Sequence, residues 1–438
     1  MAFAVLAAAF FWPLWASHPD DRRMIGPADG DFLRQFYPFR AFAAGAWGSA
    51  HPPLWNPHQY AGTPALADPQ VAVLYPWRLL QVPLAIGGRR LPLWAVELEA
   101  VAHVALGAIL AWALARRLGA PAAAAAYAGI AFGFGGYLTG YPIDQLAVLD
   151  TAVWIPATLW ALTTPVRAGG ARSRATLRGA PGLAAGGATA LAVLAGHPQT
   201  LLYALWAGTA WLAWQGVGDR SAWRRLATTF VTWLTAAAAW SAAQWLPALD
   251  FARRSARVVD PAEVAAGMPV ADVIQLVAPA FSRTWRPDAV WGSQWVPLYV
   301  GAVALPLVVW GVRHVPATRF WAALAGGGWL VSLGGHGALF PVLLRILPGM
   351  AQFRHQERAA VLVSLGLAVA AALALGRLVA DDPGGGRGRT QPGEGPEGGA
   401  PGGDPDGRPP HRDDAVSAAL AVGRLAAGLA GAAALAGA

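Results

Sequence analysis

The sequence predicts an all-α protein, a polytopic transmembrane helical bundle. Of its 438 residues, 56% are hydrophobic and only 13% are charged. Apolar runs recur along nearly the whole chain, and a helix needs about 20 such residues to cross a bilayer. Counting these runs gives about eleven candidate spans, with approximate centres at residues 9, 104, 130, 155, 188, 208, 236, 303, 328, 369 and 427.

The charged residues support the same class. The formal net charge is +8, but the Arg residues cluster beside apolar segments, as orientation signals do, and this argues against a nucleic-acid partner. The sequence contains no Cys, which excludes disulfides, thiolate metal sites and a cysteine nucleophile. Met1 to Ala16 lack a basic n-region and a convincing cleavage site, so we expect them to remain as a short first span.

Short Arg-rich loops set the predicted orientation, because such loops stay in the cytoplasm. They place the amino terminus inside and three long segments outside, at 18–91, 248–293 and 338–358. The Arg clusters fall in alternate loops: Arg116 and Arg117; Arg167, Arg172, Arg174 and Arg178; Arg220, Arg224 and Arg225; and Arg313 and Arg319.

The chain divides by composition. Residues 1–380 form the predicted transmembrane domain. Residues 381–414 are rich in Gly, Pro, Asp and Arg, with almost nothing apolar, which predicts a disordered cytoplasmic linker. The Ala-rich segment 415–438 is expected to be a final apolar span, and its end without a polar tail is typical of a truncated chain.

An amphipathic helix is predicted over Asp31–Trp47, lying on the membrane surface. Asp29 or Asp31 would lie at its amino end, where a carboxylate can cap exposed backbone amides. Two roles stay open for these carboxylates, a helix cap and a general base. The helical period comes from aromatic residues spaced by three and four: Phe32, Phe36, Phe39 and Phe42.

A longer motif follows in the same segment. It runs from Leu54-Trp55-Asn56-Pro57 through Gly62-Thr63-Pro64 and Asp68-Pro69-Gln70 to Tyr75-Pro76. It resembles the first outer loop of bacterial YfhO-like membrane proteins, LWNPxxxxGxPxxANPQxxxxYP. In that family an Asp-xxx-Gln-aromatic element precedes the motif, matched here by Asp31, Gln35 and Phe36, while Asp68 stands where Asn is usual.

Later landmarks resemble the same family in the same order. The resemblance covers about residues 20–380, and family members are much longer than this chain. The matching elements are Gly196-His197-Pro198-Gln199 for GHPQ, Gln244 to Pro247 with Ser255 and Arg257 for Q-x-LP…S-x-R, Tyr299-Val300-Gly301 for YxG, and Leu347-Pro348-Gly349 with Phe353 to Arg358 for LPG…FRxxxR.

The resemblance implies a glycosyltransferase of GT-C-like architecture in the cytoplasmic (inner) membrane of a bacterium. Such an enzyme takes a sugar from a polyprenyl-phosphate donor and places it on a cell-envelope acceptor, a polymer or a lipid, at the outer face. It also implies a catalytic carboxylate in the first outer loop. The candidates, in order, are Asp31, Asp29, and the pair Asp20 and Asp21.

Cations are needed to hold the leaving phosphate. Arg354 and Arg358 are the candidates, because guanidinium matches phosphate and a spacing of four lets one helix face present both. The alternative is an interfacial Arg pair reaching lipid headgroups. Further substrate-binding candidates from the family motifs are Gln35, Asn56, Tyr75 and His197.

Other residues keep two interpretations. His197 is either a functional histidine or part of a hydrogen-bonded turn. Asp29-Gly30-Asp31 matches a DxD motif by letter, so a divalent cation is an open expectation. Outer-loop aromatic residues that stack on sugars or anchor at the interface are Trp55, Tyr60, Trp285, Trp291 and Trp295.

Acidic residues within the second predicted span support a different class. Ionisable groups inside a span are costly and are usually functional, unless water reaches Glu97 and Glu99 from the outer end. Glu99 and His103 share one helix face, as a proton-linked transporter or flippase of a lipid-linked or amphipathic substrate would require. A noncatalytic envelope-assembly scaffold is the third class. An enzyme needs its acids in the outer loop, whereas a transporter needs them at mid-depth.

Overall fold

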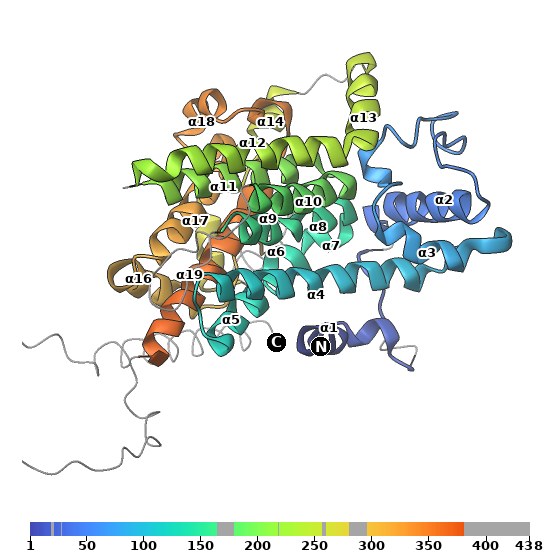
Figure 1. The fold of residues 1–438 in the computed structure, drawn as a ribbon. Helices are drawn as coiled ribbons and strands as arrows, with labels where there is room; N and C mark the ends of the chain where they lie inside the picture. The colour runs from blue at the N-terminus through green and yellow to red at the C-terminus, as the bar shows by residue number, and fades with distance from the viewer. Residues whose placement is uncertain are drawn as a thin grey trace, which may run out of the picture.

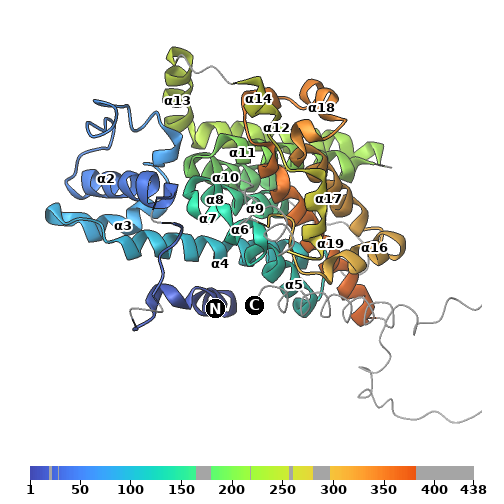
Figure 2. The ribbon, with the colours of Figure 1, turned by 180° about the vertical axis from the view of Figure 1, so that it is seen from behind.

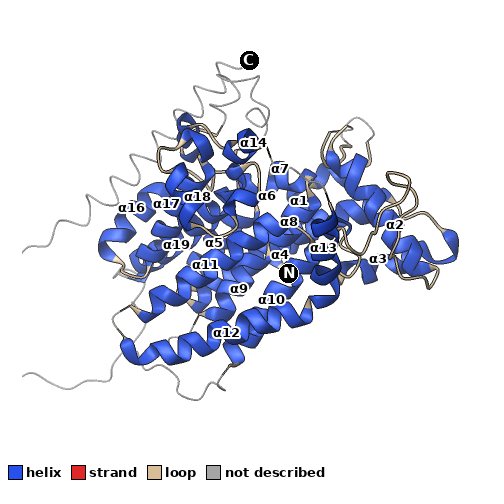
Figure 3. Ribbon diagram, turned by 90° about the horizontal axis from the view of Figure 1, so that it is seen from above, coloured by secondary structure: helices blue, strands red, loops and turns tan. Residues whose placement is uncertain are grey.

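The computed structural model of the protein describes residues 1–18, 22–27, 29–163, 179–217, 219–255, 260–279 and 296–380. Within these ranges the elements are helices (Figure 3). One isolated bridge joins Asn56 to Thr63. The predicted all-α class is therefore confirmed for the described part. Predictions that lie outside it concern Asp20, Asp21, Arg257, Trp285, Trp291, Trp295, the Arg quartet at 167–178, and segments 381–414 and 415–438.

The amino-terminal half is organised around the long helix α4, Leu93–Arg117 (Figure 1). Helices α1 (Ala2–Phe10), α5 (Ala122–Gly133) and α9 (Trp154–Leu162) pack against it. The other helices of this half are η1 (Trp12–Trp15), η2 (Phe32–Phe36), α2 (Tyr37–Gly48), η3 (Pro69–Val71), α3 (Trp77–Ala85), η4 (Ile86–Gly88), α6 (Gly136–Thr139), α7 (Tyr141–Asp144) and α8 (Leu146–Ala152).

In the carboxyl-terminal half, α10 (Ala180–Ala195) packs against α9 and α12 (Trp223–Trp240). Helix α19 (Ala360–Ala380) lies beside α5, α16 (Ala304–His314) and α17 (Thr318–Ser332) (Figure 2). Its residues are buried from Ala360 to Ala374. The other described helices are α11 (Pro198–Gly216), η5 (Arg220–Ala222), α13 (Ala242–Arg254), α14 (Pro261–Ala265), η6 (Val270–Leu276), η7 (Gly334–His336), α18 (Phe340–Ile346), η8 (Met350–Gln352) and η9 (Gln356–Ala359).

Three helical segments are long and apolar enough to cross a membrane: Leu93–Arg117, Ala122–Thr139 and Gln356–Ala380. A fourth becomes possible if Arg220–Trp240 and Ala242–Arg254, which are bent by 78°, form one broken span. The about eleven spans expected from hydropathy are therefore not shown within the described residues.

The difference arises because the apolar runs are longer than the helices they form. The run centred near residue 155 is divided at Val153 between two short helices, α8 and α9. The run near residue 9 ends its first helix at Phe10, ahead of Pro13, and the run near 303 yields the eleven-residue α16. Window hydropathy measures apolar length and does not register such breaks.

The amphipathic helix expected over Asp31–Trp47 is confirmed by η2 and α2, which together extend from Phe32 to Gly48. Phe32 and Phe36 are fully buried in the main core, and Phe39 packs against Val71 and Val73 of the following loop. The aromatic face therefore packs onto the protein itself and not onto lipid. This packing fixes one wall of the site described next.

Candidate functional site

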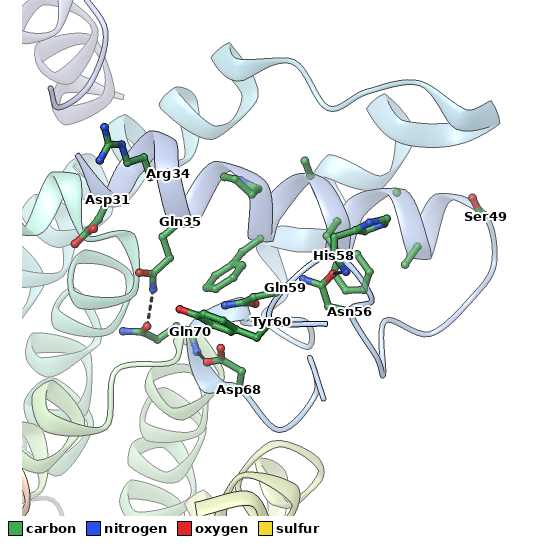
Figure 4. Close-up of a pocket in the computed structure, with 16 residues that line it drawn as sticks. Asp31, Arg34, Gln35, Ser49, Asn56, His58, Gln59, Tyr60, Asp68 and Gln70 are labelled. Carbon is green, nitrogen blue, oxygen red and sulfur yellow. Dashed lines mark hydrogen bonds between the residues drawn. The ribbon is translucent and has the colours of Figure 1, made fainter. Parts of the chain in front are cut away.

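A pocket of about 990 Å³ lies between η2, α2 and the loop that follows them. Its walls combine carboxylates, amides and aromatic rings (Figure 4). The polar and aromatic lining residues are Asp31, Arg34, Gln35, Phe39, Phe42, Ser49, Asn56, His58, Gln59, Tyr60, Asp68 and Gln70.

The pocket brings together three of the residues predicted from sequence, Asp31, Gln35 and Asn56. Gln35 Nε2 donates to Gln70 Oε1 at 2.6 Å and so joins the helix to the loop (Figure 4). Asn56 is buried, and its Oδ1 accepts from the His58 amide at 3.0 Å. The long loop motif is therefore a folded wall, held by its own amide side chains.

Asp31 does not cap the helix that it begins. Its side chain makes no capping hydrogen bond. The amides of Asp31 and Phe32 instead donate to the carboxylate of Asp144, each at 3.2 Å. The half-buried Asp31 carboxylate accepts a hydrogen bond from Gln145 Nε2 through Oδ2. The capping role that the sequence left open for Asp31 is thus filled by Asp144, which the sequence analysis missed.

Asp144 fits closely against two glycines. A Cβ atom at Gly26 or Gly30 would lie 2.3 or 2.6 Å from Asp144 Oδ1, so a side chain at either position would displace the carboxylate. Burial raises the pKa of Asp144; the two amides oppose this, and the carboxylates of Asp31 and Asp29 add to the rise. Asp29 itself is exposed. The sequence signal that could have identified Asp144 is its position as an acid shortly before the apolar run that begins at Leu146.

Arg354 and Arg358 do not share a helix face, contrary to the prediction from their spacing. His355 lies between them with φ of 59°, a left-handed conformation that interrupts the helix. Arg354 is exposed, and its Nη1 lies 3.3 Å from the Glu263 carboxylate. Arg358 is buried. Arg354 and Arg358 therefore cannot bind one phosphate together from a single helix face.

Arg358 reaches α7, the helix next to Asp31. Its Nη2 donates to the Tyr141 hydroxyl at 3.2 Å and its Nη1 donates to Gln199 Oε1 at 3.0 Å. Its Nε has no hydrogen-bond partner in the described part of the chain. Burial raises the pKa of Tyr141; Arg358 opposes this, and the charge of Asp31 adds to the rise. Arg358 and Asp31, both predicted site residues, therefore both affect the pKa of Tyr141 in α7.

His197 caps α11 at its amino end. Its Nδ1 accepts from the Thr200 amide at 3.2 Å, and its own amide donates to Thr151 Oγ1 at 3.1 Å. Gly196 has φ of 97°, and a Cβ there would lie 1.9 Å from the carbonyl oxygen of Pro69. The GHPQ element therefore touches the first-loop motif. His197 does not line the pocket, and these contacts are those of the hydrogen-bonded turn.

A second group of charged residues lies behind the pocket wall and is closed to solvent. Arg40 is fully buried and donates to Glu99 Oε1 at 3.2 Å and to Asp150 Oδ2 at 3.3 Å. Its Nη1 donates to the carbonyl oxygens of Gln70 at 2.9 Å and Val71 at 3.1 Å. Arg40 therefore ties the pocket wall to α4 and α8.

Tyr75 belongs to this buried group and not to the pocket. Its hydroxyl lies 2.7 Å from His103 Nε2. His103 Nδ1 lies 2.7 Å from the Glu99 carbonyl oxygen, which can only accept, so Nε2 accepts from Tyr75. Gln81 and Arg78 also donate to the Glu99 carboxylate. We name this group the Arg40–Glu99 cluster: Arg40, Tyr75, Arg78, Gln81, Glu99, His103 and Asp150.

The residues that the structure describes contain no group of three or more His, Asp or Glu side chains suited to hold a metal ion. The divalent cation expected from Asp29-Gly30-Asp31 therefore stays a sequence-based expectation.

Known protein families give no match to this chain. No curated protein matches it significantly in sequence. Among solved structures, the chain is similar to the crystal structure of ArnT from Cupriavidus metallidurans bound to undecaprenyl phosphate. The sequence identity is 16% and the TM-score 0.41, with 86% of this chain and 78% of the ArnT chain covered. A likeness with this TM-score carries no argument about fold or function.

Proposed function

We propose that the protein is a membrane glycosyltransferase of the GT-C type. It transfers a sugar from a polyprenyl-phosphate donor to a cell-envelope acceptor at the outer face of the bacterial inner membrane. The observation that carries this proposal is the position of Asp31 at a polar pocket of about 990 Å³, with its carboxylate released from helix capping by Asp144. The YfhO-like motifs supply the substrate class.

The chemistry needs a base on one side of the reacting carbon and a cation on the other. The acceptor hydroxyl oxygen bonds to the anomeric carbon while its proton passes to the Asp31 carboxylate. The bond from that carbon to the phosphate oxygen breaks, and the electron pair leaves with the phosphate. Arg358, whose buried Nε has no hydrogen-bond partner among the described residues, is the cation proposed to stabilise that charge. Asp29 is the second candidate base.

Gln35 and Asn56 are proposed to bind the acceptor, because amide groups both donate to and accept from sugar hydroxyls. Tyr60 is 88% exposed at the pocket edge, and its ring is free to stack on a sugar. Arg354, Arg358, His197 and Tyr75 all lie outside the pocket lining. Of these, Arg358 donates to Tyr141 of α7, next to Asp31, and the other three stay predicted substrate-binding residues without geometric support.

The transporter alternative needs Glu99 and His103 to exchange protons with water or substrate. Both side chains are enclosed in the Arg40–Glu99 cluster, at 0% and 1% exposure. No observation favours transport over transfer, and none favours the scaffold.

The test compares two Asp→Asn variants in cells that lack the chromosomal gene. Asp31→Asn keeps the size of the side chain and an oxygen for Gln145, but it cannot take a proton. Sugar carried by the envelope polymers, measured by mass spectrometry, should fall by about 10²–10⁴-fold in rate. Asp250→Asn alters an exposed Asp paired with Arg254 and should leave the sugar content at the wild-type level. Wild-type sugar content with Asp31→Asn present in the membrane would overturn the proposal.

A further inference from the structure

The segment from Tyr141 to Gln145 contacts both the proposed base and the proposed cation. Gln145 donates to the Asp31 carboxylate, Asp144 accepts from the Asp31 amide, and Tyr141 accepts from Arg358. The helix α7 and the residue that follows it, Gln145, thus touch the base, the backbone that carries the base, and the cation. None of these three side chains was singled out from the sequence.

The Gln145 amide is held in a fixed place. The residue is 7% exposed, and its backbone amide donates to the Pro142 carbonyl at 3.1 Å. Its own carbonyl accepts from the Val148 amide at 2.8 Å, at the start of α8. Backbone bonds on both sides therefore limit where the side-chain amide can point, as a positioning residue requires.

The hydrogen bond from Gln145 uses one oxygen of Asp31. The donor reaches Oδ2, and no second hydrogen bond to the Asp31 carboxylate is found among the described residues. Asp144 accepts from the amides at the start of the helix, and within the described part of the chain Oδ1 of Asp31 accepts no hydrogen bond. A base needs such a free lone pair within reach of the substrate proton.

We propose that Gln145 is the positioning residue that orients Asp31, so that one oxygen is held and the other faces the acceptor hydroxyl. The inference deepens the proposed function and rests on it. Gln145 does not touch substrate; it acts through Asp31. The charged and titratable groups facing Asp31 are Asp29 in its own loop, Arg34 on its helix, and Asp144 and Tyr141 on α7.

The first test removes the donor. Gln145→Met keeps the length of the side chain and loses the N–H group. Sugar content of envelope polymers should fall roughly 10- to 100-fold in rate, the effect expected for a hydrogen bond to a charged group. Gln215→Met is the matched control, because it removes another amide donor, to the Leu162 carbonyl at 3.1 Å, remote from the site. That control should keep the wild-type sugar content.

The second test reads the Asp31 carboxylate without catalysis. A water-soluble carbodiimide with glycine ethyl ester modifies protonated carboxyl groups, and peptide mass spectrometry separates Asp31 from Asp29. Gln145→Glu places another carboxylate against Asp31, which disfavours the ionised form. The pH midpoint of Asp31 modification should therefore move to higher pH in Gln145→Glu, and stay unchanged in Gln215→Met.

Undiminished sugar content in Gln145→Met, or an unmoved midpoint in Gln145→Glu, overturns the inference while leaving the loss in Asp31→Asn intact. Full activity of Asp31→Asn overturns the proposed function itself, and the positioning role with it. Each variant is compared at equal amounts in the membrane, so a folding defect is recognised by its lower amount and apparent Tm. If Gln145→Met does not accumulate, the Gln145→Glu midpoint decides.

Discussion

The pocket at Asp31 and the Arg40–Glu99 cluster share a wall, yet they hold their charges in opposite ways. Gln70 belongs to both, since its side chain lines the pocket while its carbonyl accepts from Arg40. The cluster balances two Arg against two acids and is closed to solvent. The pocket side has an excess of acids and is open. The paired, buried charges of the Arg40–Glu99 cluster therefore support the fold. The acids of the pocket, which lie beside water without an ion-pair partner among the described residues, are available for chemistry.

The largest effect is expected from breaking the cluster. Arg40→Met leaves Glu99 and Asp150 facing one cation fewer and frees two backbone carbonyls. Removing one partner of a buried ion pair costs about 3–5 kcal/mol. Arg34→Met, on the exposed pocket side of the same helix, should change stability by less than about 0.5 kcal/mol.

The measurement is the apparent unfolding free energy in detergent, together with the amount of protein in the membrane. A variant that fails to accumulate while Arg34→Met does so supports the structural role of the cluster. Equal stability of the two variants would remove the distinction between the two regions.

A smaller effect is expected where Gly196 of the GHPQ element touches Pro69 of the first-loop motif. Gly196→Ala forces a side chain into a left-handed conformation, at about 1–2 kcal/mol, and against the Pro69 carbonyl, at about 1–3 kcal/mol more. Gly326 lies in α17 with open space around it, so Gly326→Ala should be neutral or stabilising, by up to about 1 kcal/mol. Thermal unfolding of both variants decides, and a Gly196→Ala protein as stable as Gly326→Ala would contradict the contact.

The sequence allowed the wall of the pocket to be predicted, because local spacing determines it. The Phe32, Phe36 and Phe39 period gives the helix, and the loop motif places Asn56 opposite it. Arg40 was missed, although it lies on the same buried face as Phe36, four residues on. A charge on an apolar face indicates a buried partner, yet its partner Asp150 is 110 residues away.

The same reason explains the remaining misses. Asp144 and Gln145 contact Asp31 across more than one hundred residues, and periodicity carries no information on such pairs. Arg354 and Arg358 have the spacing of a helix face, but a single left-handed residue, His355, separates them. Span number was overestimated because apolar composition does not show where a helix breaks.

The smallest effect is expected at Asp68, where the pocket meets the cluster. Burial raises the pKa of Asp68 above its ordinary 3.8; the Gln70 amide and Arg40 oppose this. A raised pKa means that the folded state loses stability as pH rises through the folded value. Asp68→Asn keeps an oxygen for the Gln70 amide without the charge.

Asp68→Asn should therefore be more stable than the wild type at pH 7, with the difference shrinking toward pH 4. Apparent Tm values across this range measure it. A wild-type protein that gains stability relative to Asp68→Asn as pH rises would contradict the assigned burial.

Labelling from outside the membrane tests the central claim, that the Asp31 pocket opens to the external water, most directly. The chain has no Cys, so single introduced cysteines give no background. With a membrane-impermeant maleimide on intact spheroplasts, Arg34→Cys in the pocket should be labelled, while Arg224→Cys in a predicted cytoplasmic loop should react only after permeabilisation. Labelling of Arg34→Cys only after permeabilisation would place the pocket on the wrong side and contradict the account.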